Sequence, residues 1–580
     1  MPGPEHDGGK TAEILAAGRI SLKKRLADRV CLPSCYVLLL KTETTNRSRI
    51  FKNEKMKPEL FSSPVLEVAL AGAALAGGTL TAQAAAPDKR PNIVWIMAED
   101  MTHDLGCYGM PAVKTPVLDK MASEGLFYTN ARCSAPISSP SRSGMMTGLH
   151  CTTIDAHNHR SNRDKALPQG VYPFTYYLRQ AGYTCILGAT GAFANTYTNS
   201  PHECSRKIDC NFRFDEIGPY DGVTQFGLFD KYDEMLPSDA PFFSQITLYV
   251  THRGDWWKRI RSESKHPVDP AAVQLPSYMA DHPRIREEFA CYLDQVEYMD
   301  AEVGMILDRL EERGLADNTV VFFIGDNGRA DIRAKGFLYD HGTRVPMIVW
   351  GKGIEPGVVN DLVSTMDITA TILQMAGVEI PANFESRPLF DASGAPAEQR
   401  EWVYATRDTW DEVMECIRGV VDDRYVYIRN YFPQYPYDHN QIYTDFYRPA
   451  LHVMRRLKAE GKLSPVESLF LAESKPVEEL YDYRADPDNV KNLACDPEYL
   501  GVLNRMRVRM DSRLSSFVDC GIADRFSRVL PESRKEENRP RSFVREHHPD
   551  EWQKLVDGEI CDKYDIWKTE QQAYFRSQGR

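Results

Sequence analysis

Polar side chains suited to ligand binding or proton transfer follow three apolar segments, at the point where each segment ends. The pairs are Glu99-Asp100 after residues 93–98, Thr251-His252 after residues 245–250, and Asp326-Asn327 after residues 319–324 and Gly325. Each segment has the length and composition of a buried strand. Because open α/β sheets bind ligands beyond the carboxyl ends of their strands, three such ends predict one functional site. A single Asp there is more often a helix cap or turn residue, so the prediction depends on all three.

The elements that would position these residues follow from the hydrophobic pattern. Short apolar segments alternate with helical patterns, which predicts a large, mainly parallel sheet sandwiched by helices. Apolar residues from Phe289 to Leu310 recur at steps of three and four, as in one long amphipathic helix. Residues 402–405 and 425–429 are expected to be strands of a second sheet. The predicted fold class is α/β, with a smaller C-terminal antiparallel α+β domain.

Residues 138–148, SSPSRSGMMTG, resemble the signature of formylglycine-dependent type I sulfatases of the alkaline-phosphatase superfamily. That signature has Cys or Ser, any residue, Pro, Ser and Arg, then a hydrophobic pair and Thr-Gly. Other family segments occur in the right order, at residues 91–94, 104–109, 115–119, 122–125, 326–328, 335–339, 342–346, 479–482, 486–487 and 492–494. A Ser/Pro-rich loop entering a helix, the ordinary interpretation, does not account for these flanking matches. The resemblance implies an alkaline-phosphatase-like fold.

The resemblance also implies that Ser138 is oxidised to formylglycine by a sulfatase-maturing enzyme. In the family, the hydrated aldehyde attacks sulfur, and its second hydroxyl lets the sulfated intermediate collapse and release sulfate. An ordinary serine would be left with a sulfate ester that itself needs hydrolysis. Oxidation of serine is associated with oxygen-independent bacterial maturation, which implies a bacterial host.

The family holds one divalent cation, usually calcium, between two strand ends. The corresponding ligands here are Glu99, Asp100, Asp326, Asn327 and the modified Ser138. An all-oxygen set suits Ca²⁺, or Mg²⁺ as the alternative, rather than zinc. Family members more often carry Asp where Glu99 stands, but a longer carboxylate still reaches a flexible Ca²⁺ shell.

Three further residues correspond to catalytic positions of the family. Arg142 would stabilise the nucleophile by charge and hydrogen bonding. His252 would contact the sulfate and protonate the leaving atom, a role suited to a side chain that titrates near neutral pH. Lys335 would bind the sulfuryl oxygens. The ordinary alternative is that Lys335 is a solvated surface lysine. Its place inside a matched motif disfavours this alternative.

The sequence departs from the family pattern after residues 181–183. The family usually carries a lysine and a histidine on the next strand, where Thr190 and Ala192 stand here. This departure leaves three interpretations: a diverged subfamily that uses other groups, a slow enzyme, or a binding protein that has lost turnover. Candidate replacement and substrate-binding groups are His157, His159, Arg160 and His341, although a lone histidine is more often structural.

The C-terminal region, at residues 425–431, 445–447 and 479–482, resembles heparan N-sulfatases (sulfamidases) and related bacterial sulfatases. The resemblance implies a sulfated saccharide substrate, an N- or O-sulfated glucosamine of a glycosaminoglycan. Arg407 is a candidate for pairing with such an anionic sugar. Packing of the small sheet onto the large one is an equal alternative for any single side chain of this region.

Composition limits the class of partner. The chain of 580 residues has a formal net charge of −12, which argues against nucleic acid, because phosphate binding needs concentrated Lys and Arg. No span of about 20 apolar residues predicts a transmembrane helix. Residues 68–80, followed by Ala82-Gln83-Ala84, have the pattern of a signal peptide, which predicts export to the periplasm or cell surface. An Ala/Gly-rich tail is the alternative.

These patterns divide the chain into five parts. Residues 1–55 show no periodicity and are interpreted as a leader added by an over-extended start, and residues 56–89 are expected to form the signal peptide and linker. A catalytic domain is expected at 90–400 and a smaller domain at 401–520. The charged residues 521–580 are expected to be an extension without a core role.

Two functions other than sulfatase activity remain open at this point. The same fold can hydrolyse phosphate or phosphonate esters with an unmodified serine, usually with two metal ions, whereas the sequence supplies ligands for one. A sulfated-glycan binder that has lost turnover is the non-enzymatic alternative, and Thr190 and Ala192 motivate it.

Overall fold

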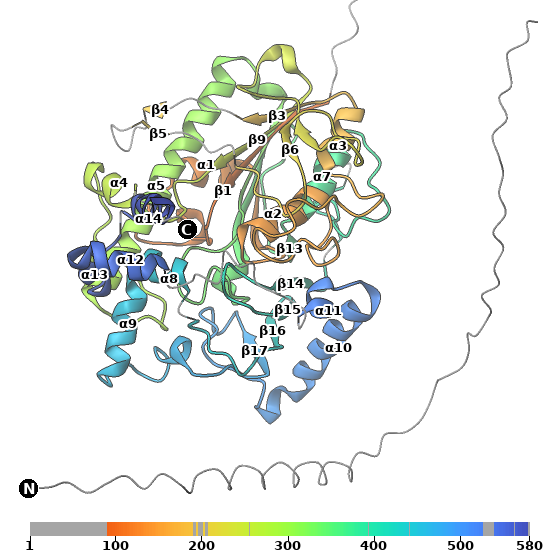
Figure 1. Ribbon diagram of the computed structural model, residues 1–580. Helices are drawn as coiled ribbons and strands as arrows, with labels where there is room; N and C mark the ends of the chain where they lie inside the picture. Colours follow the sequence, from red (N-terminus) through yellow and green to blue (C-terminus); the bar gives the residue numbers. More distant parts are fainter. Residues whose placement is uncertain are drawn as a thin grey trace, which may run out of the picture. The chain divides into compact units, whose positions relative to one another are not determined.

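The computed structural model describes residues 90–188, 193–194, 201–202, 207–254, 256–391, 394–398, 400–439, 441–525, 539–561 and 563–577 (Figure 1). The expected leader, signal peptide and linker (1–89), and the positions of Thr190 and Ala192, lie outside these residues. Within the described ranges, no helix combines the length and apolar character that crossing a bilayer requires.

A large mixed sheet forms the centre of the catalytic region. Its strand order is β12-β2-β11-β10-β1-β9-β3-β8, with β13 paired to β2. Neighbouring strands are parallel except where β11 meets β10 and β2. The strands are β1 (Asn92–Ala98), β2 (Leu126–Arg132), β3 (Thr184–Gly188), β8 (Lys231–Asp233), β9 (Phe242–Leu248), β10 (Thr319–Gly325), β11 (Arg344–Gly351), β12 (Gly357–Val359) and β13 (Val363–Ser364). The predicted mainly parallel α/β sheet is therefore confirmed.

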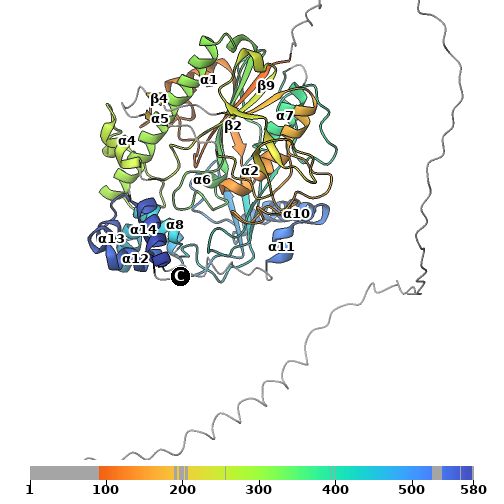
Figure 2. The same cartoon turned by 45° about the horizontal axis from the view of Figure 1, so that its top comes forward.

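Helices cover both faces of this sheet (Figures 1 and 2). Side chains of β1 alternate between two cores, with Trp95 in one and Ile96 in the other, because successive residues of a strand point to opposite faces. Helices α2 (Ser138–Thr147), α3 (Phe174–Gln180) and α7 (Asp367–Met375) close the first core. Helices α1 (Pro116–Glu124), α4 (Trp257–Glu263) and α5 (Pro283–Glu312) close the second. The predicted long amphipathic helix is α5.

A second, antiparallel sheet follows in the order β14-β15-β16-β17. Its strands are β14 (Val403–Arg407), β15 (Ile417–Val421), β16 (Tyr425–Asn430) and β17 (Glu478–Asp482). One face shares a core with α9 and the other packs on α10. Other elements are α6 (Asp340–Thr343), α8 (Ile442–Tyr447), α9 (Pro449–Ala459), α10 (Leu500–Ser516), α11 (Cys520–Asp524), and the short strands β4 (Phe193–Ala194), β5 (Pro201–His202), β6 (Asp215–Ile217) and β7 (Gly227–Phe229).

One strand differs from its sequence expectation. The strand expected at 245–250 spans Phe242–Leu248, because pairing with β1 ends at Ala98 opposite Leu248. The next residues turn, and the backbone N–H of His252 donates to the carbonyl of Tyr249 at 2.9 Å. His252 therefore lies in a turn beyond the strand rather than at its last position.

The charged C-terminal segment also differs from expectation, since it packs into a small core that it shares with α8. Helices α12 (Arg539–His547), α13 (Pro549–Val556) and α14 (Tyr564–Ser577) lie beside α8 and α9 (Figure 1). Phe543, Leu555 and Trp567 are buried with Phe446 of α8. Few apolar residues suffice because each short helix contributes one or two side chains to a shared cluster.

Removing the centre of this cluster should destabilise the protein. Phe446 is fully buried, and its ring lies 4.9 Å from that of Tyr564 and 5.9 Å from that of Trp567. We expect Phe446→Ala to lower the free energy of unfolding by about 3–5 kcal/mol, measured by denaturant unfolding. Ile566→Ala, at a position 52% exposed on α14, should change it by less than about 0.5 kcal/mol. Equal small effects of both substitutions would show that these helices do not share a core with α8.

Candidate active site

The ends of two adjacent parallel strands bring four polar side chains together. Glu99 and Asp100 follow β1, Asp326 and Asn327 follow β10, and Ala98 pairs with Gly325 in the register between them. The backbone N–H of Asp100 donates to Oδ1 of Asp326 at 3.0 Å, and Nδ2 of Asn327 donates to Oδ1 of Asp100 at 3.0 Å. All four are at most 1% exposed. Asp100 has a φ of 48°, a left-handed conformation that is uncommon outside glycine.

Ser138 reaches this cluster from the opposite direction, because it begins α2. Its hydroxyl donates to Oδ1 of Asn327 at 3.0 Å, and the hydroxyl of Ser141 donates to the carbonyl of Asp326 at 2.7 Å. The amino end of a helix carries partial positive charge, which favours an anion or an oxygen nucleophile there. Helix α2 therefore places Ser138 directly against the carboxylate cluster.

Arg142 lies one turn further along α2 and pairs with two of the carboxylates. Its Nε donates to Oδ2 of Asp326 at 3.0 Å, and its Nη2 lies 3.5 Å from Oε1 of Glu99. Burial disfavours the charged guanidinium, but Asp326 and Glu99 outweigh burial and raise the pKa of Arg142. The side chain therefore stays cationic at the nucleophile.

Lys335 and His252 contact the remaining carboxylate, Asp100. Nζ of Lys335 lies 2.6 Å from Oδ1, and Nε2 of His252 lies 3.6 Å from Oδ2. Nδ1 of His252 is 2.8 Å from the carbonyl of Arg253, to which it must donate, so Nε2 faces the site. Burial lowers the pKa of His252 to about 4, although Asp100 opposes the shift. The hydroxyl of Tyr443, on α8, completes this side of the site at 3.5 Å from Oδ2 of Asp100.

The cluster has the donors that a hard divalent cation requires. Glu99, Asp100 and Asp326 offer carboxylate oxygens, Asn327 and Ser138 offer neutral oxygens, and such sets suit Ca²⁺ or Mg²⁺. Oε1 of Glu99 is buried without a hydrogen-bond partner in the described part of the chain. Burial raises the pKa of Asp326; Arg142 opposes this shift, and the charges of Glu99 and Asp100 reinforce it. Additional positive charge would relieve this repulsion, so the residues present fit a cation.

Lys207 is a site residue that sequence reasoning missed. Its Nζ lies 2.7 Å from Oε2 of Glu99 and 3.4 Å from Oδ2 of Asp209, and its carbonyl accepts from Nη1 of Arg142 at 3.1 Å. It lies outside every family segment and outside the ends of the predicted strands. The only sequence signal was a charged pair, Lys207 and Asp209, that flanks a buried Ile208.

The candidate substrate-binding residues that follow the nucleophile helix are connected to the carboxylate cluster less directly. Arg160 connects to its edge through Asp209, at 3.4 Å, and its side chain is 47% exposed. Nδ1 of His159 lies 2.9 Å from Asp411. His157 lies between Asp155 and Asp524, at 3.8 and 3.5 Å.

His341 and Arg407 are held by other partners. His341 contacts the hydroxyl of Tyr278 at 2.9 Å and Arg329 at 3.2 Å. Arg407 is buried, with its guanidinium 5.0 Å from the ring of Phe337, and burial lowers its pKa to about 10. The structure therefore does not bring His157, His341 or Arg407 into contact with Ser138 or the carboxylates, and the role of each stays a prediction.

A serine at a helix terminus, a buried carboxylate cluster and surrounding lysines and arginine together define a hydrolase for an anionic ester. The model of the sulfatase family matches residues 91–378. The model of the N-sulphoglucosamine sulphohydrolase C-terminal region matches residues 328–444, so the two together span more than half of the chain. The chain belongs to the sulfatase family and is a sulfuric ester hydrolase, which confirms the resemblance seen in the sequence.

Known relatives agree with this assignment. An ulvan-active sulfatase of Formosa agariphila is 29% identical over 464 residues, covering 74% of this chain and 76% of the relative. Human N-sulphoglucosamine sulphohydrolase is 26% identical over 460 residues, covering 72% of this chain and 88% of the relative. A solved phosphonate monoester hydrolase from Silicibacter pomeroyi matches with a TM-score of 0.52 at 16% identity, covering 75% of this chain and 97% of that chain. This last likeness shows a shared fold and carries no conclusion about the reaction.

Lys207 should matter for turnover because its charge lies within the site. We expect Lys207→Ala to lower kcat for sulfate release by roughly 10²-fold, as loss of one charge-stabilising donor does in other hydrolases. Lys207→Arg should recover part of kcat, which a purely structural role of the lysine would not predict. Lys120→Ala, at a side chain 71% exposed, is the matched control and should leave kcat unchanged. An unaltered kcat in Lys207→Ala would exclude the role.

Proposed function

We propose that this protein hydrolyses sulfate from a sulfated carbohydrate, with a formylglycine made from Ser138 as nucleophile and one divalent cation in the carboxylate cluster. The observation that carries the proposal is the position of the Ser138 hydroxyl, 3.0 Å from Oδ1 of Asn327 and at the edge of the carboxylate cluster. A nucleophile surrounded by fixed charges suits a reaction whose transition state redistributes negative charge.

Glu99, Asp100, Asp326, Asn327 and the modified Ser138 would hold the cation, which we propose to be Ca²⁺, with Mg²⁺ as the alternative. Once bound, it would supply positive charge that stabilises the sulfuryl oxygens and the ionised nucleophile. Two of these carboxylates also pair with lysines. Nζ of Lys335 lies 2.6 Å from Oδ1 of Asp100, and Nζ of Lys207 lies 2.7 Å from Oε2 of Glu99. A cation that takes over those carboxylates would leave both ammonium groups available for the sulfate.

The chain's own side chains divide the remaining work. Arg142 is fixed by Asp326 and would supply positive charge to the modified residue at position 138, one turn away on α2. His252 presents Nε2 to the site as an acceptor, because Nδ1 carries the proton of the neutral imidazole; Nε2 can therefore take up a proton during the reaction and pass it to the leaving oxygen or nitrogen. Formylglycine, formed by a sulfatase-maturing enzyme, would supply a hydrated aldehyde whose second hydroxyl allows sulfate to leave without attack by water.

For the substrate, we propose an N- or O-sulfated glucosamine of a glycosaminoglycan. The match of residues 328–444 to the N-sulphoglucosamine sulphohydrolase C-terminal model supports this choice, as does the human relative of that name. The ring of Tyr443, which is partly buried, lies 5.1 Å from Nζ of Lys335 and offers a surface on which a sugar ring can pack. Trp410, with its ring 5.9 Å from the same Nζ, is buried and supports Lys335 from the protein side. The relative from Formosa agariphila is an ulvan-active sulfatase. Ulvan is therefore the alternative substrate to test beside sulfated glucosamine.

We also propose that the protein is exported to the periplasm or cell surface. The apolar residues 68–80 and the small-residue pattern at 82–84 support export. Sequencing the amino terminus of protein recovered from the periplasm tests this, since a cleaved product should begin near residue 85.

The modification of Ser138 is the first test. After co-expression with a serine-type maturing enzyme, the peptide that contains Ser138 should lose two hydrogens, a mass decrease of about 2 Da, as oxidation to an aldehyde requires. The matured protein should release sulfate from N- or O-sulfated glucosamine, whereas Ser138→Ala should not. A serine that stays unmodified with several competent enzymes would favour a serine phosphohydrolase. Modified protein that binds sulfated sugars without releasing sulfate would favour a glycan-binding protein.

Calcium should stabilise the protein through the carboxylate cluster. A ligand that binds only the folded state adds about 2.7 kcal/mol of stability at a concentration 100 times its Kd, so Tm should rise when Ca²⁺ is added to chelator-treated protein. Asp326→Asn keeps the shape of the side chain but removes its charge, and should abolish the rise. Glu311→Gln, at an exposed carboxylate of α5, is the control. A Ca²⁺-dependent shift of the same size in Asp326→Asn would place the cation elsewhere.

A further inference from the structure

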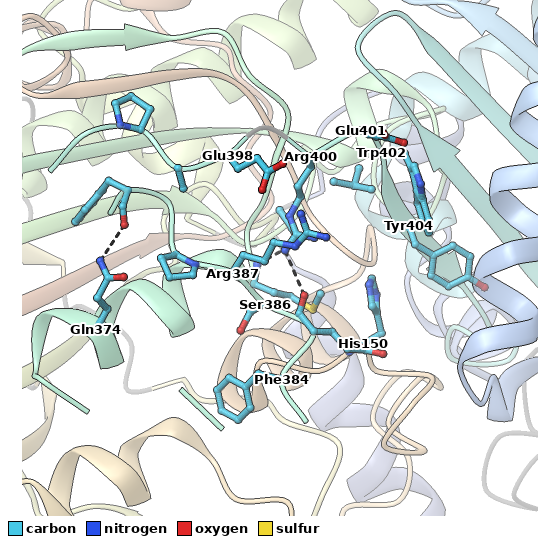
Figure 3. Close-up of a pocket in the computed structure, with 18 of the residues that line it drawn as sticks. His150, Gln374, Phe384, Ser386, Arg387, Glu398, Arg400, Glu401, Trp402 and Tyr404 are labelled. Carbon is cyan, nitrogen blue, oxygen red and sulfur yellow. Dashed lines mark hydrogen bonds between the residues drawn. The ribbon is translucent and has the colours of Figure 1, made fainter. Parts of the chain in front are cut away.

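The chain after residue 444 lies beyond the residues that the two family models match, 91–378 and 328–444. Within this part, Arg513 of α10 lines a cavity of about 970 Å³ beside Gly148, whose carbonyl accepts hydrogen bonds from two residues of the cavity wall (Figure 3). The ten residues of α2 place Gly148 about 15 Å from Ser138. Helices α12, α13 and α14 instead share a core with α8, which borders the active site. Their contact with α8 therefore connects the C-terminal region with the active site.

Tyr443 of α8 lies beside three side chains of the active site. Its hydroxyl donates to Oδ2 of Asp100 at 3.5 Å. Its ring centroid lies 5.1 Å from Nζ of Lys335 and 6.3 Å from the ring of His252. An ammonium group over a tyrosine ring is attracted by the negative face of the ring. A displacement of Tyr443 would therefore change the position of Lys335.

Helix α8 is too short to fix its own position. It spans six residues, and an isolated helix of that length is not stable in water. At its start, the backbone N–H of Ile442 donates to Oε1 of Glu412 at 2.6 Å, and further along Asp445 pairs with Arg455 of α9 at 2.8 Å. The aromatic side chains of α8 pack against the C-terminal helices instead. The place of α8 therefore depends on its neighbours.

A row of aromatic rings links α14 to Tyr443. Tyr564, the first residue of α14, has its ring centroid 4.7 Å from that of Tyr447. Tyr447 lies four residues after Tyr443 on the same face of α8, with the two ring centroids 5.0 Å apart. Helix α12 contacts α8 as well, since Nε of Arg541 lies 2.5 Å from Oδ2 of Asp445. Both helices therefore hold α8 directly, one through a ring and the other through an ion pair.

We propose that α12 and α14 are a positioning element of the active site. By holding α8 they fix the place of Tyr443, and through Tyr443 they fix the place of Lys335. Tyr564 is the positioning residue of α14. The role of Lys335 in binding the sulfate rests on the proposed function, whereas the position of Tyr443 does not. If these helices only stabilised the fold, a change at Tyr564 would lower stability and leave the active site of the folded protein unaltered.

The first test observes the position of Tyr443 and needs no sulfatase activity. Fluorotyrosine is incorporated at this position alone in the full-length protein, and fluorine NMR spectra are recorded. We expect Tyr564→Ala to shift or split the resonance, whereas Tyr564→Phe, which keeps the ring, should preserve the parent spectrum. Tyr574→Ala is the matched control, because it removes a tyrosine ring of α14 that faces Phe543 and His547 of α12 at 5.7 and 5.0 Å. It should leave the resonance in place.

The second test measures turnover by matured protein at a temperature well below Tm. We expect Tyr564→Ala to lower kcat/KM for sulfate release from N-sulfated glucosamine by roughly three- to tenfold, the value of one aromatic contact. Tyr564→Phe should restore most of kcat/KM, and Tyr574→Ala should match the parent. In a Tyr443→Ala background, Tyr564→Ala should cause little further loss, because residues that act through one another are not additive.

Three results would overturn the proposal. An unchanged fluorine resonance in Tyr564→Ala would show that Tyr443 is held without α14. An unchanged kcat/KM in that variant would remove the role in the active site. An equal loss of kcat/KM with and without Tyr443 would show that Tyr564 acts by another route. Failure of the proposed function is distinct, because it appears as matured parent protein that releases no sulfate, while the fluorine spectra still decide whether α14 positions Tyr443.

Discussion

The burial of three carboxylates within one small volume is the constraint on which the active site depends. Glu99, Asp100 and Asp326 are almost completely removed from water, and isolated buried charges cost several kcal/mol each. The protein compensates them with Lys207, Lys335 and Arg142, which come from three different segments. Each ion pair therefore joins a distant part of the chain to the end of β1 or β10. The same ion pairs therefore neutralise the buried carboxylates and hold the separate segments of the site together.

The register of the sheet makes this clustering possible. Strand β1 lies between β9 and β10, and Ala98 is level with both Leu248 and Gly325. The three strands consequently end at the same level of the sheet. This brings residues that are more than 200 positions apart into hydrogen-bonding distance. The alternation of β1 side chains fixes a helical layer on each face. The layer that contains α2 is held by Met145 and Met146 in the core, so the nucleophile is positioned by packing at the other end of its helix.

Much of this arrangement was predictable, and the failures have physical causes. Apolar strands that end in Glu99-Asp100 and Asp326-Asn327 are local patterns, and parallel strands bring such ends together. Lys207 was not predictable, because it approaches the site from a segment whose path depends on tertiary packing. The start of β9 was placed too late because the buried Ser244 interrupts the apolar pattern. The helical core around Phe446 was missed because each short helix buries too few residues to produce a clear periodicity.

Helix α2 carries the nucleophile, and its rigidity limits how far changes elsewhere in the molecule can move Ser138. All ten of its residues are buried, and α3 and α7 pack against it. A fully packed helix transmits no displacement unless its neighbours also have a second arrangement, since close-packed interiors resist small shifts. The packing of α2 therefore holds Ser138 at a fixed place beside the ends of β1 and β10. Fixed charges and a fixed nucleophile are what stabilisation of a transition state without reorganisation requires, so the burial of α2 and the burial of the carboxylates serve the same end.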